Sequence, residues 1–242
     1  MVEKSTKNRA YYSAIPWVLF VFIMASAYFL NDTFDLNYST FGIYPRELSG
    51  LKGILFSPFI HGSIEHLGNN TLPILILGTA ILFFYGRLGL KVIGVMYLLT
   101  GILVWLSARE SYHIGASGLI YAFAAFLFMS GILRRAKNLV ALSLLVAFLY
   151  GGLFWGIFPV KEQVSWESHL WGGVVGFVIA WFYRKEGPQR KKYIWEDEED
   201  EEELLDSDLQ NESRPQRIQQ RPRQRIVVKY DYKEKKEKGD TE

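Results

Sequence analysis

Cysteine is absent from the 242-residue chain, and histidine occurs only four times. The lack of cysteine excludes a disulfide framework, a thiolate nucleophile and a thiolate metal site. Polar stretches are scarce before Gly187, because half of all residues are hydrophobic and nearly all of these lie in that part of the chain. The small net charge of +2 identifies no partner by itself, and we expect no nucleic-acid partner. This uneven composition is typical of a membrane protein followed by a polar tail.

The apolar residues gather into segments of about 18 to 21 residues, the length at which a helix crosses ~30 Å of hydrocarbon. Six such spans are expected, at 12–30, 66–86, 88–108, 115–133, 138–158 and 166–184. The sequence therefore predicts an all-α polytopic membrane protein, a bundle of six transmembrane helices.

The Lys/Arg bias of the short flanking loops predicts the orientation, because cytoplasmic loops carry an excess of these residues. One set of flanks contains Lys4, Lys7, Arg9, Arg87, Lys91, Arg134, Arg135, Lys137, Arg184 and Lys185. The other set has loops at least as long and contains only Arg46, Lys52, Arg109 and Lys161. The first set is predicted to be cytoplasmic, so that both termini lie inside.

The first span also has features of a cleavable signal peptide, namely a basic start, an apolar core and the sequence Ala25-Ser26-Ala27. Tyr28, Phe29 and Leu30 continue the apolar run past that point, which favours an uncleaved anchor. The connection that follows, residues 31–65, is rich in aromatic residues and proline. We expect it to pack in or on the membrane interface.

Three parts are predicted: a cytoplasmic N-terminus at 1–11, a six-span membrane domain at 12–184, and a charged cytoplasmic tail at 185–242. The tail holds an acidic block at Glu196–Glu203 and a segment rich in Arg, Gln and Pro at 214–225. Its few apolar residues cannot offset the entropy of ordering, so the tail is predicted to be disordered. Basic residues near the last span can attract anionic lipid headgroups.

Several polar residues are predicted to lie at one depth near the outer face. Ser117, flanked closely by Gly115 and Gly118, begins the fourth span, and His169 begins the sixth. His61, His66 and Asn70 lie at the start of the second span. These three spans all run from outside to inside, because alternate spans of a polytopic protein share one direction. A shared depth is necessary for a common site.

Small residues indicate which faces of the fourth and sixth spans lie against each other. His169, Gly172, Gly173 and Gly176 fall at i, i+3, i+4 and i+7, which places the histidine at the top of a glycine stripe. Gly118, Ala122 and Ala125 form a comparable face on the fourth span. Because small residues let membrane helices approach closely, these two faces are expected to meet and to bring His169 beside Ser117. Tyr121, one turn below the serine, would then lie against the imidazole.

These residue types match the needs of nucleophilic catalysis. A serine hydroxyl is a weak nucleophile, and an imidazole can take its proton and later deliver it to a leaving amine. Glu167 lies two residues before His169, on another part of the helix surface, so a dyad is more economical than a triad. His66 and Asn70 share a helix face and can supply N–H groups to an oxyanion, together with the backbone amide of Ser117. Each residue alone is commonly a packing residue, but their occurrence at one depth favours a site.

The residues also resemble those of a known family. His61-x4-His66-x3-Asn70, Gly115-x-Ser117-Gly118-x2-Tyr121 and His169-x2-Gly172-x3-Gly176, in this order on alternate spans, resemble the rhomboid intramembrane serine proteases. The resemblance implies a six-helix bundle with a water-filled cavity that is open to the outer side. It also implies that a Ser117/His169 dyad cleaves single-span membrane proteins in or near their transmembrane segments.

The resemblance assigns further roles. It implies that His66 and Asn70 help the Ser117 amide to bind the oxyanion, that Tyr121 stacks on His169, and that His61 forms supporting hydrogen bonds. It implies no cofactor and no metal, and it places the site on the periplasmic or outer side of a bacterial inner membrane. Some family members carry a Trp-Arg pair in the first outer loop, whereas this chain has Tyr44-Pro45-Arg46.

Two alternatives remain open. The chain can be an inactive rhomboid-like scaffold that binds membrane clients, although such relatives typically lack the serine or the histidine. It can also be a zinc-dependent membrane hydrolase that uses His61, His66 and His169 with Glu65 or Glu167, although no H-E-x-x-H pattern occurs. The oligomeric state cannot be read from the sequence. Phe148, Tyr150, Phe154 and Trp155 can form a lateral gate for substrate entry, with the loop 159–165 as a cap, but packing against lipid is the favoured role for most of them.

Overall fold

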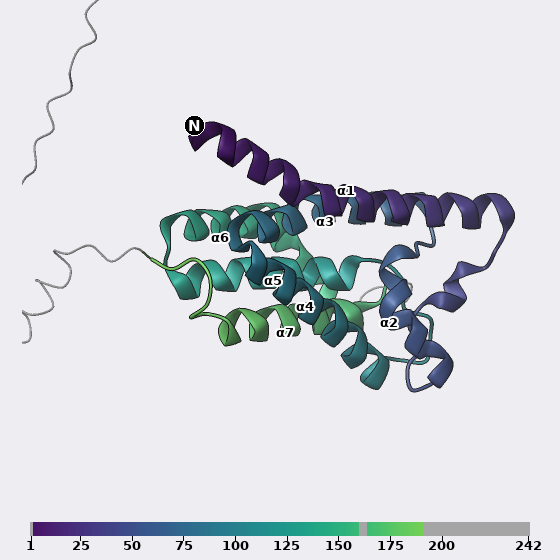
Figure 1. Ribbon diagram of the computed structural model, residues 1–242. Coiled ribbons are helices and arrows are strands. Elements are labelled where there is room, and N and C mark those ends of the chain that lie inside the picture. Colours follow the sequence, from purple (N-terminus) through teal and green to yellow (C-terminus); the bar gives the residue numbers. More distant parts are fainter. Residues whose placement is uncertain (1, 160–163, 191–242) are drawn as a thin grey trace, which may run out of the picture. The chain divides into compact units, whose positions relative to one another are not determined.

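A computed structural model describes residues 2–159 and 164–190 of the chain (Figure 1). The described part is all-helical apart from one isolated bridge between Ile43 and His113. Its longer helices are α1 (Val2–Phe34), α3 (Ile64–Tyr85), α4 (Arg87–Ser107), α5 (Ser117–Arg134), α6 (Lys137–Tyr150) and α7 (Trp166–Phe182). Shorter helical turns are η1 (Tyr38–Phe41), η2 (Leu48–Lys52), α2 (Gly53–Phe56), η3 (Ser57–Phe59) and η4 (Gly151–Ile157).

Four of the described helices are long and apolar enough to cross a membrane. They are Thr6–Phe34 within α1, and α3, α4 and α5 in full. Of the other helices, α6 is apolar but has 14 residues, and α7 has 17. The chain is therefore a polytopic helical membrane protein, as predicted from its hydropathy.

The limits of two predicted spans differ from the structure by more than two residues. The fifth span was expected as one helix over 138–158, but α6 ends at Tyr150 and a 3-10 helix follows at Gly151–Ile157. Two successive glycines at this point weaken the α-helix, because glycine loses the most conformational freedom on ordering. At the other end of the chain, α1 begins at Val2, ahead of the predicted first span. The predicted tail lies outside the described residues from 191 onward.

Helix α5 lies in the centre of the bundle and packs against α3, α4, α6 and α7 (Figure 1). Its Phe123, Phe126 and Leu127 are fully buried. Large apolar side chains on the outer helices face away from the bundle, for example Phe22 of α1, Leu144 of α6 and Phe182 of α7. Because these outward faces are apolar, they fit a lipid surrounding.

The first outer connection is folded onto the protein. The backbone N–H of Arg46 donates to the carbonyl of Trp105 near the end of α4 (2.9 Å), and its guanidinium donates to the carbonyl of Ala108 (2.7 Å). Ile43 exchanges two backbone hydrogen bonds of 2.9 Å with His113. These contacts join the connection to the loop 108–116, which leads into α5.

Helices α5 and α7 meet through their backbones. A Cβ atom added to Gly172 would lie 2.0 Å from the carbonyl oxygen of Gly118, and one added to Gly176 would lie 2.1 Å from that of Ala122. The two small-residue faces therefore meet as predicted. Gly173 was expected in the same stripe, but a Cβ atom there would have no neighbour within 4 Å. Gly173 points away from α5, because successive residues of a helix are rotated by about 100°.

At the opposite end, Arg134 joins α5 to the end of α7. The Arg134 guanidinium donates hydrogen bonds to the carbonyl oxygens of Tyr183 (2.6 Å) and Glu186 (2.8 Å). Tyr183 directly follows the last residue of α7, and Glu186 lies three residues further on, so Arg134 binds the chain just beyond the end of that helix. The two helices are thus fixed to each other at both ends.

We expect Gly176→Ala to destabilise the protein and Gly173→Ala to have little effect. The added methyl group at position 176 collides with backbone, so α5 and α7 must separate, at a cost of about 1–3 kcal/mol. Thermal unfolding of both variants in detergent, compared with the unsubstituted protein, measures this difference. Equal midpoints for the two variants would contradict the close helix contact.

Candidate active site

The side chains of Ser117 and His169 meet where α5 and α7 begin. Ser117 is the first residue of α5, and His169 lies in the first turn of α7. The hydroxyl oxygen of Ser117 is 2.8 Å from Nε2 of His169. The structure thus brings together two residues that are 52 positions apart in the chain. The serine is partly exposed, whereas His169 is buried.

Two further contacts hold the His169 ring. Its Nδ1 lies 2.9 Å from the carbonyl oxygen of Gly156 in η4. The ring of Tyr121 stacks on the imidazole, with centroids 4.2 Å apart and an interplanar angle of 5°. A carbonyl oxygen only accepts, so Nδ1 carries the proton and Nε2 is left to accept the hydroxyl proton of Ser117. The arrangement can therefore activate a serine nucleophile.

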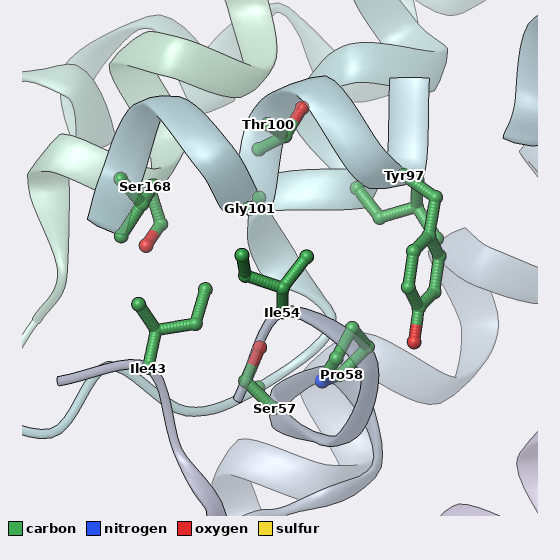
Figure 2. A pocket seen from close by; sticks show the side chains of 12 residues that line it. Ile43, Ile54, Ser57, Pro58, Tyr97, Thr100, Gly101 and Ser168 are labelled. Carbon is green, nitrogen blue, oxygen red and sulfur yellow. The ribbon is translucent and has the colours of Figure 1, made fainter. Parts of the chain in front are cut away.

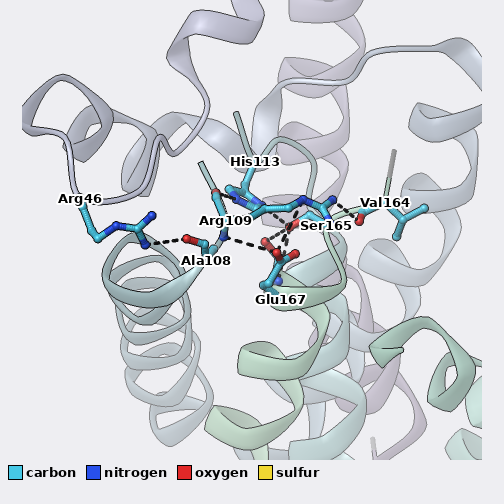
Figure 3. A network of polar contacts seen from close by, with 8 residues as sticks. Arg46, Ala108, Arg109, His113, Val164, Ser165 and Glu167 are labelled. Carbon is cyan, nitrogen blue, oxygen red and sulfur yellow. Dashed lines mark hydrogen bonds and ion pairs between the residues drawn. The ribbon is translucent and has the colours of Figure 1, made fainter. Parts of the chain in front are cut away.

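The Gly156 carbonyl takes the place that a carboxylate occupies in a catalytic triad. Glu167, the acidic residue closest to His169 in the sequence, instead faces Arg109, whose backbone N–H and Nε lie 3.4 and 3.7 Å from Oε1 (Figure 3). The sequence offered no sign of the Gly156 contact, because its functional atom belongs to the backbone.

His61, His66 and Asn70 form a second group next to Gly115. The side-chain amide nitrogen of Asn70 is 3.0 Å from Nε2 of His61, and the rings of His61 and His66 lie edge to face, 4.9 Å apart. A Cβ atom on Gly115 would lie 2.6 Å from Nε2 of His66 and 3.5 Å from the Asn70 amide nitrogen. Gly115 has φ +102°, a conformation that residues with a side chain rarely adopt. Both constraints require glycine here, two residues before Ser117.

Donors for an oxyanion surround this position. An amide nitrogen has two hydrogens, so Asn70 can donate one to His61 and keep the other for a ligand. The backbone N–H of Ser117 belongs to the first turn of α5, where N–H groups have no intrahelical acceptor. Burial, assisted by the neighbouring His66, lowers the pKa of His61 to about 4. At neutral pH, His61 is therefore an uncharged partner for Asn70.

Figure 2 shows a small pocket, and Gly115 and Gly118 are among the residues that line it. Hydroxyl groups of Ser57, Thr100 and Ser168 line it, together with apolar side chains such as Ile43 and Ile54. The Gly115 N–H donates to the carbonyl of Ser57 (2.8 Å), which joins the first outer connection to the loop before Ser117. Neither Ser117 nor His169 lines this pocket.

The residues predicted to form a gate lie partly at the surface. Phe148 of α6 and Trp155 of η4 are 86% and 71% exposed. Tyr150 is half-buried and packs against the core. The predicted cap, 159–165, includes residues 160–163, which lie outside the described part. A gating role for these aromatic residues stays a prediction.

His113 was not among the residues predicted to form the site. It is buried and contacts Ser165, directly before α7, with 2.6 Å between Nδ1 and Oγ. The signal that could have identified it is its position, since it lies four residues before Ser117 in the same outer loop.

Comparisons with known proteins show which chains this one is similar to. Residues 49–186 match the model of the rhomboid domain. An uncharacterized protein of Mycobacterium tuberculosis is 38% identical over 163 residues, which cover 62% of this chain and 65% of the relative. An uncharacterized protein of Mycobacterium leprae is 36% identical over 164 residues, 62% of each chain. This chain thus spans less than two thirds of the length of these curated relatives.

The Gly156 contact can be tested by adding a methyl group. In Gly156→Ala, the new Cβ would lie 1.9 Å from the hydroxyl oxygen of Tyr121 and 3.2 Å from Nδ1 of His169. We expect η4 to move away and the labelling of Ser117 by a fluorophosphonate to slow by about 10-fold or more.

Tyr121→Phe removes the colliding oxygen and leaves the ring carbon 3.1 Å from the new methyl group. The double variant Gly156→Ala/Tyr121→Phe should therefore be labelled faster than Gly156→Ala alone. The single variant Tyr121→Phe measures the effect of losing the hydroxyl group by itself. A double variant no faster than Gly156→Ala would contradict this account.

The lowered pKa of His61 predicts a pH-dependent stability. Between pH 6.5 and about 4, the unfolded chain binds a proton at His61 and the folded chain does not. The stability that neutral His61 provides is therefore complete above pH 6.5 and is lost as the pH falls toward 4, by up to about 3 kcal/mol. Thermal unfolding between pH 7.5 and about 4.5, with Ser117→Ala as the background, measures this loss. His61→Gln should flatten the dependence, and an unchanged slope would argue against it.

Proposed function

The chain belongs to the rhomboid family, and we propose that it is an intramembrane serine protease that hydrolyses peptide bonds in or near the transmembrane segments of other membrane proteins. The family is one of intramembrane serine proteases. The observation that carries the proposal is the 2.8 Å contact between the Ser117 hydroxyl and Nε2 of His169.

In the proposed reaction, His169 first acts as a base. Nε2 takes the hydroxyl proton as the Ser117 oxygen attacks the carbonyl carbon of the substrate. The Gly156 carbonyl, 2.9 Å from Nδ1, stabilises the imidazolium that forms. His169 then gives its proton to the leaving amine, and the peptide bond breaks to leave an acyl group on Ser117. A water molecule, deprotonated by the same Nε2, releases this acyl group as the carboxylic acid product.

Three groups are proposed to stabilise the negative charge on the substrate oxygen. The backbone N–H of Ser117 and the side chains of His66 and Asn70 donate hydrogen bonds to it. His61 acts through Asn70, since the hydrogen bond between them fixes the amide. Tyr121 keeps the imidazole in the plane that faces Ser117.

The proposed topology has six spans with both termini in the cytoplasm. The 14 residues of α6 and the 7 residues of η4 then form one span, and α7 forms the last. The dyad lies where α5 and α7 begin, and the positive-inside rule supports the proposal that this end faces the outer side. Because the relatives are mycobacterial proteins, we place the chain in a bacterial cytoplasmic membrane with its site open outward. Its partners are transmembrane substrates and lipids.

The same contacts argue against the two alternatives. A scaffold would have no need of the Ser117–His169 hydrogen bond, which is intact here. A zinc ligand needs a free ring nitrogen, but both nitrogens of His169 have hydrogen-bond partners. Among the described residues, no three His, Asp or Glu side chains gather at one point.

Substitution of the nucleophile tests the proposal. We expect Ser117→Ala to abolish cleavage of a single-span substrate in proteoliposomes, because loss of a serine nucleophile typically costs about 10⁴-fold or more in rate. Labelling by a fluorophosphonate should disappear as well. Ser39→Ala, in the first outer connection, is the matched control and should retain both activities. Undiminished cleavage by Ser117→Ala would refute the assignment.

A further inference from the structure

Figure 3 shows a second contact between a serine and a histidine, formed by Ser165 and His113. Nδ1 of His113 is 2.6 Å from the hydroxyl oxygen of Ser165. His113 lies four residues before Ser117, and Ser165 lies four residues before His169. Both contacts therefore join the same two segments with the same sequence separation of 52 residues, but with the roles of serine and histidine exchanged.

The directions of the hydrogen bonds around His113 follow from chemistry. Nε2 of His113 lies 3.0 Å from the carbonyl oxygen of Arg109, which can only accept, so Nε2 carries a proton. Burial lowers the pKa of His113, which favours the neutral ring. In a neutral ring, Nδ1 is then an acceptor and Ser165 is its donor.

Ser165 also begins α7. Its hydroxyl oxygen accepts from the backbone N–H of Ser168 (3.4 Å), and it lies 2.6 Å from the Ser168 hydroxyl. Because Ser165 gives its own proton to His113, Ser168 is the donor between the two hydroxyls. One side chain thus caps α7 and joins the helix to the loop that carries His113.

His113 is itself held in place. It is 2% exposed, and its backbone exchanges two hydrogen bonds with Ile43. A second link joins the same segments nearby, since the Arg109 guanidinium donates to the carbonyl of Val164 (2.8 Å) and lies 3.7 Å from Glu167 (Figure 3). A movement of Ser165 away from this loop therefore requires the loss of several hydrogen bonds, of which the one to His113 is partly buried and costly to leave unmade.

The path from Ser165 to the dyad is short. The backbone N–H of His169 donates to the carbonyl of Ser165 (3.3 Å), so the two residues belong to one helical turn. On the other side, only three residues separate His113 from Ser117, and the last two are Gly115 and Ala116, which is buried. A shift of Ser165 relative to His113 would therefore change the distance between Ser117 and His169.

We propose that His113 is a positioning residue of the Ser117/His169 dyad, and that its hydrogen bond to Ser165 fixes the separation at which His169 accepts the serine proton. The inference rests on the proposed function and adds a residue to it. His113 does not touch the reacting atoms, and it acts through Ser165 and the first turn of α7.

Two substitutions of His113 separate its two hydrogen bonds. In His113→Asn, the side-chain amide takes the place of Nδ1 and can still accept from Ser165. In His113→Gln, the amide takes the place of Nε2, so it keeps the bond to Arg109 and loses the bond to Ser165. We expect kcat for a single-span substrate to fall by about 10-fold or more in His113→Gln, because small displacements of reacting groups are costly. The change in His113→Asn should be much smaller, and KM should stay the same in both variants.

Active-site titration distinguishes positioning from a merely structural role. Fluorophosphonate labelling counts the molecules with a competent dyad, and the cleavage rate is then expressed per labelled site. A positioning role lowers the rate per site in His113→Gln, whereas a structural role lowers only the number of sites. Ser165→Thr keeps the hydroxyl group and should retain the rate per site, and Ser165→Ala should lose it to the same extent as His113→Gln.

Equal rates per site in His113→Gln and the unsubstituted protein would overturn the inference while leaving the proposed function intact. Equal losses in His113→Asn and His113→Gln would also overturn it, because the bond to Ser165 would then be irrelevant. An unsubstituted protein that neither cleaves nor is labelled would refute the proposed function, and this inference with it.

Discussion

The rest of the site depends on the close approach of α5 and α7. Lipid tails are as apolar as leucine side chains, so helices in a membrane are held together by packing and hydrogen bonds. Gly172 and Gly176 let α7 rest on the backbone of Gly118 and Ala122, and Arg134 fixes the other end of the pair. With both ends fixed, the first turns of the two helices can present a hydroxyl and an imidazole at 2.8 Å. A separation of the helices by the width of one methyl group would break that contact.

Much of this arrangement could be predicted from the sequence. The helical spacing of Gly172 and Gly176 indicated which face of α7 meets α5, and the common direction of alternate spans placed Ser117 and His169 at one depth. Both signals are periodic, and a regular helix converts a period directly into a position in space. Gly173 departs from the prediction, because residues at i+3 and i+4 cover a wide arc of the helix and only part of that arc meets the neighbouring helix.

The parts that could not be predicted are those in which no residue type repeats at helical spacing. His113 and Ser165 lie in loops, where sequence spacing does not define direction. Helix α6 ends at Tyr150, directly before Gly151 and Gly152. These glycines weaken the α-helix, but they do not interrupt the apolar run from which the span was predicted. The docking of Ile43 and Arg46 on the loop before α5 is made largely by backbone groups, and these are present at every position of the chain. None of these features is indicated by a repeating pattern of side chains.

The acceptor that orients His169 is the carbonyl oxygen of Gly156, and all twenty amino acids carry this atom. Random mutagenesis would therefore report position 156 only as intolerant of bulk, and the oxygen itself would escape detection. In a protease with a carboxylate in this place, a single codon change can remove the group that steadies the imidazole. Here the corresponding atom is a backbone oxygen, which no amino-acid substitution removes. Natural variants can lose the contact only through a change in the backbone conformation of this segment.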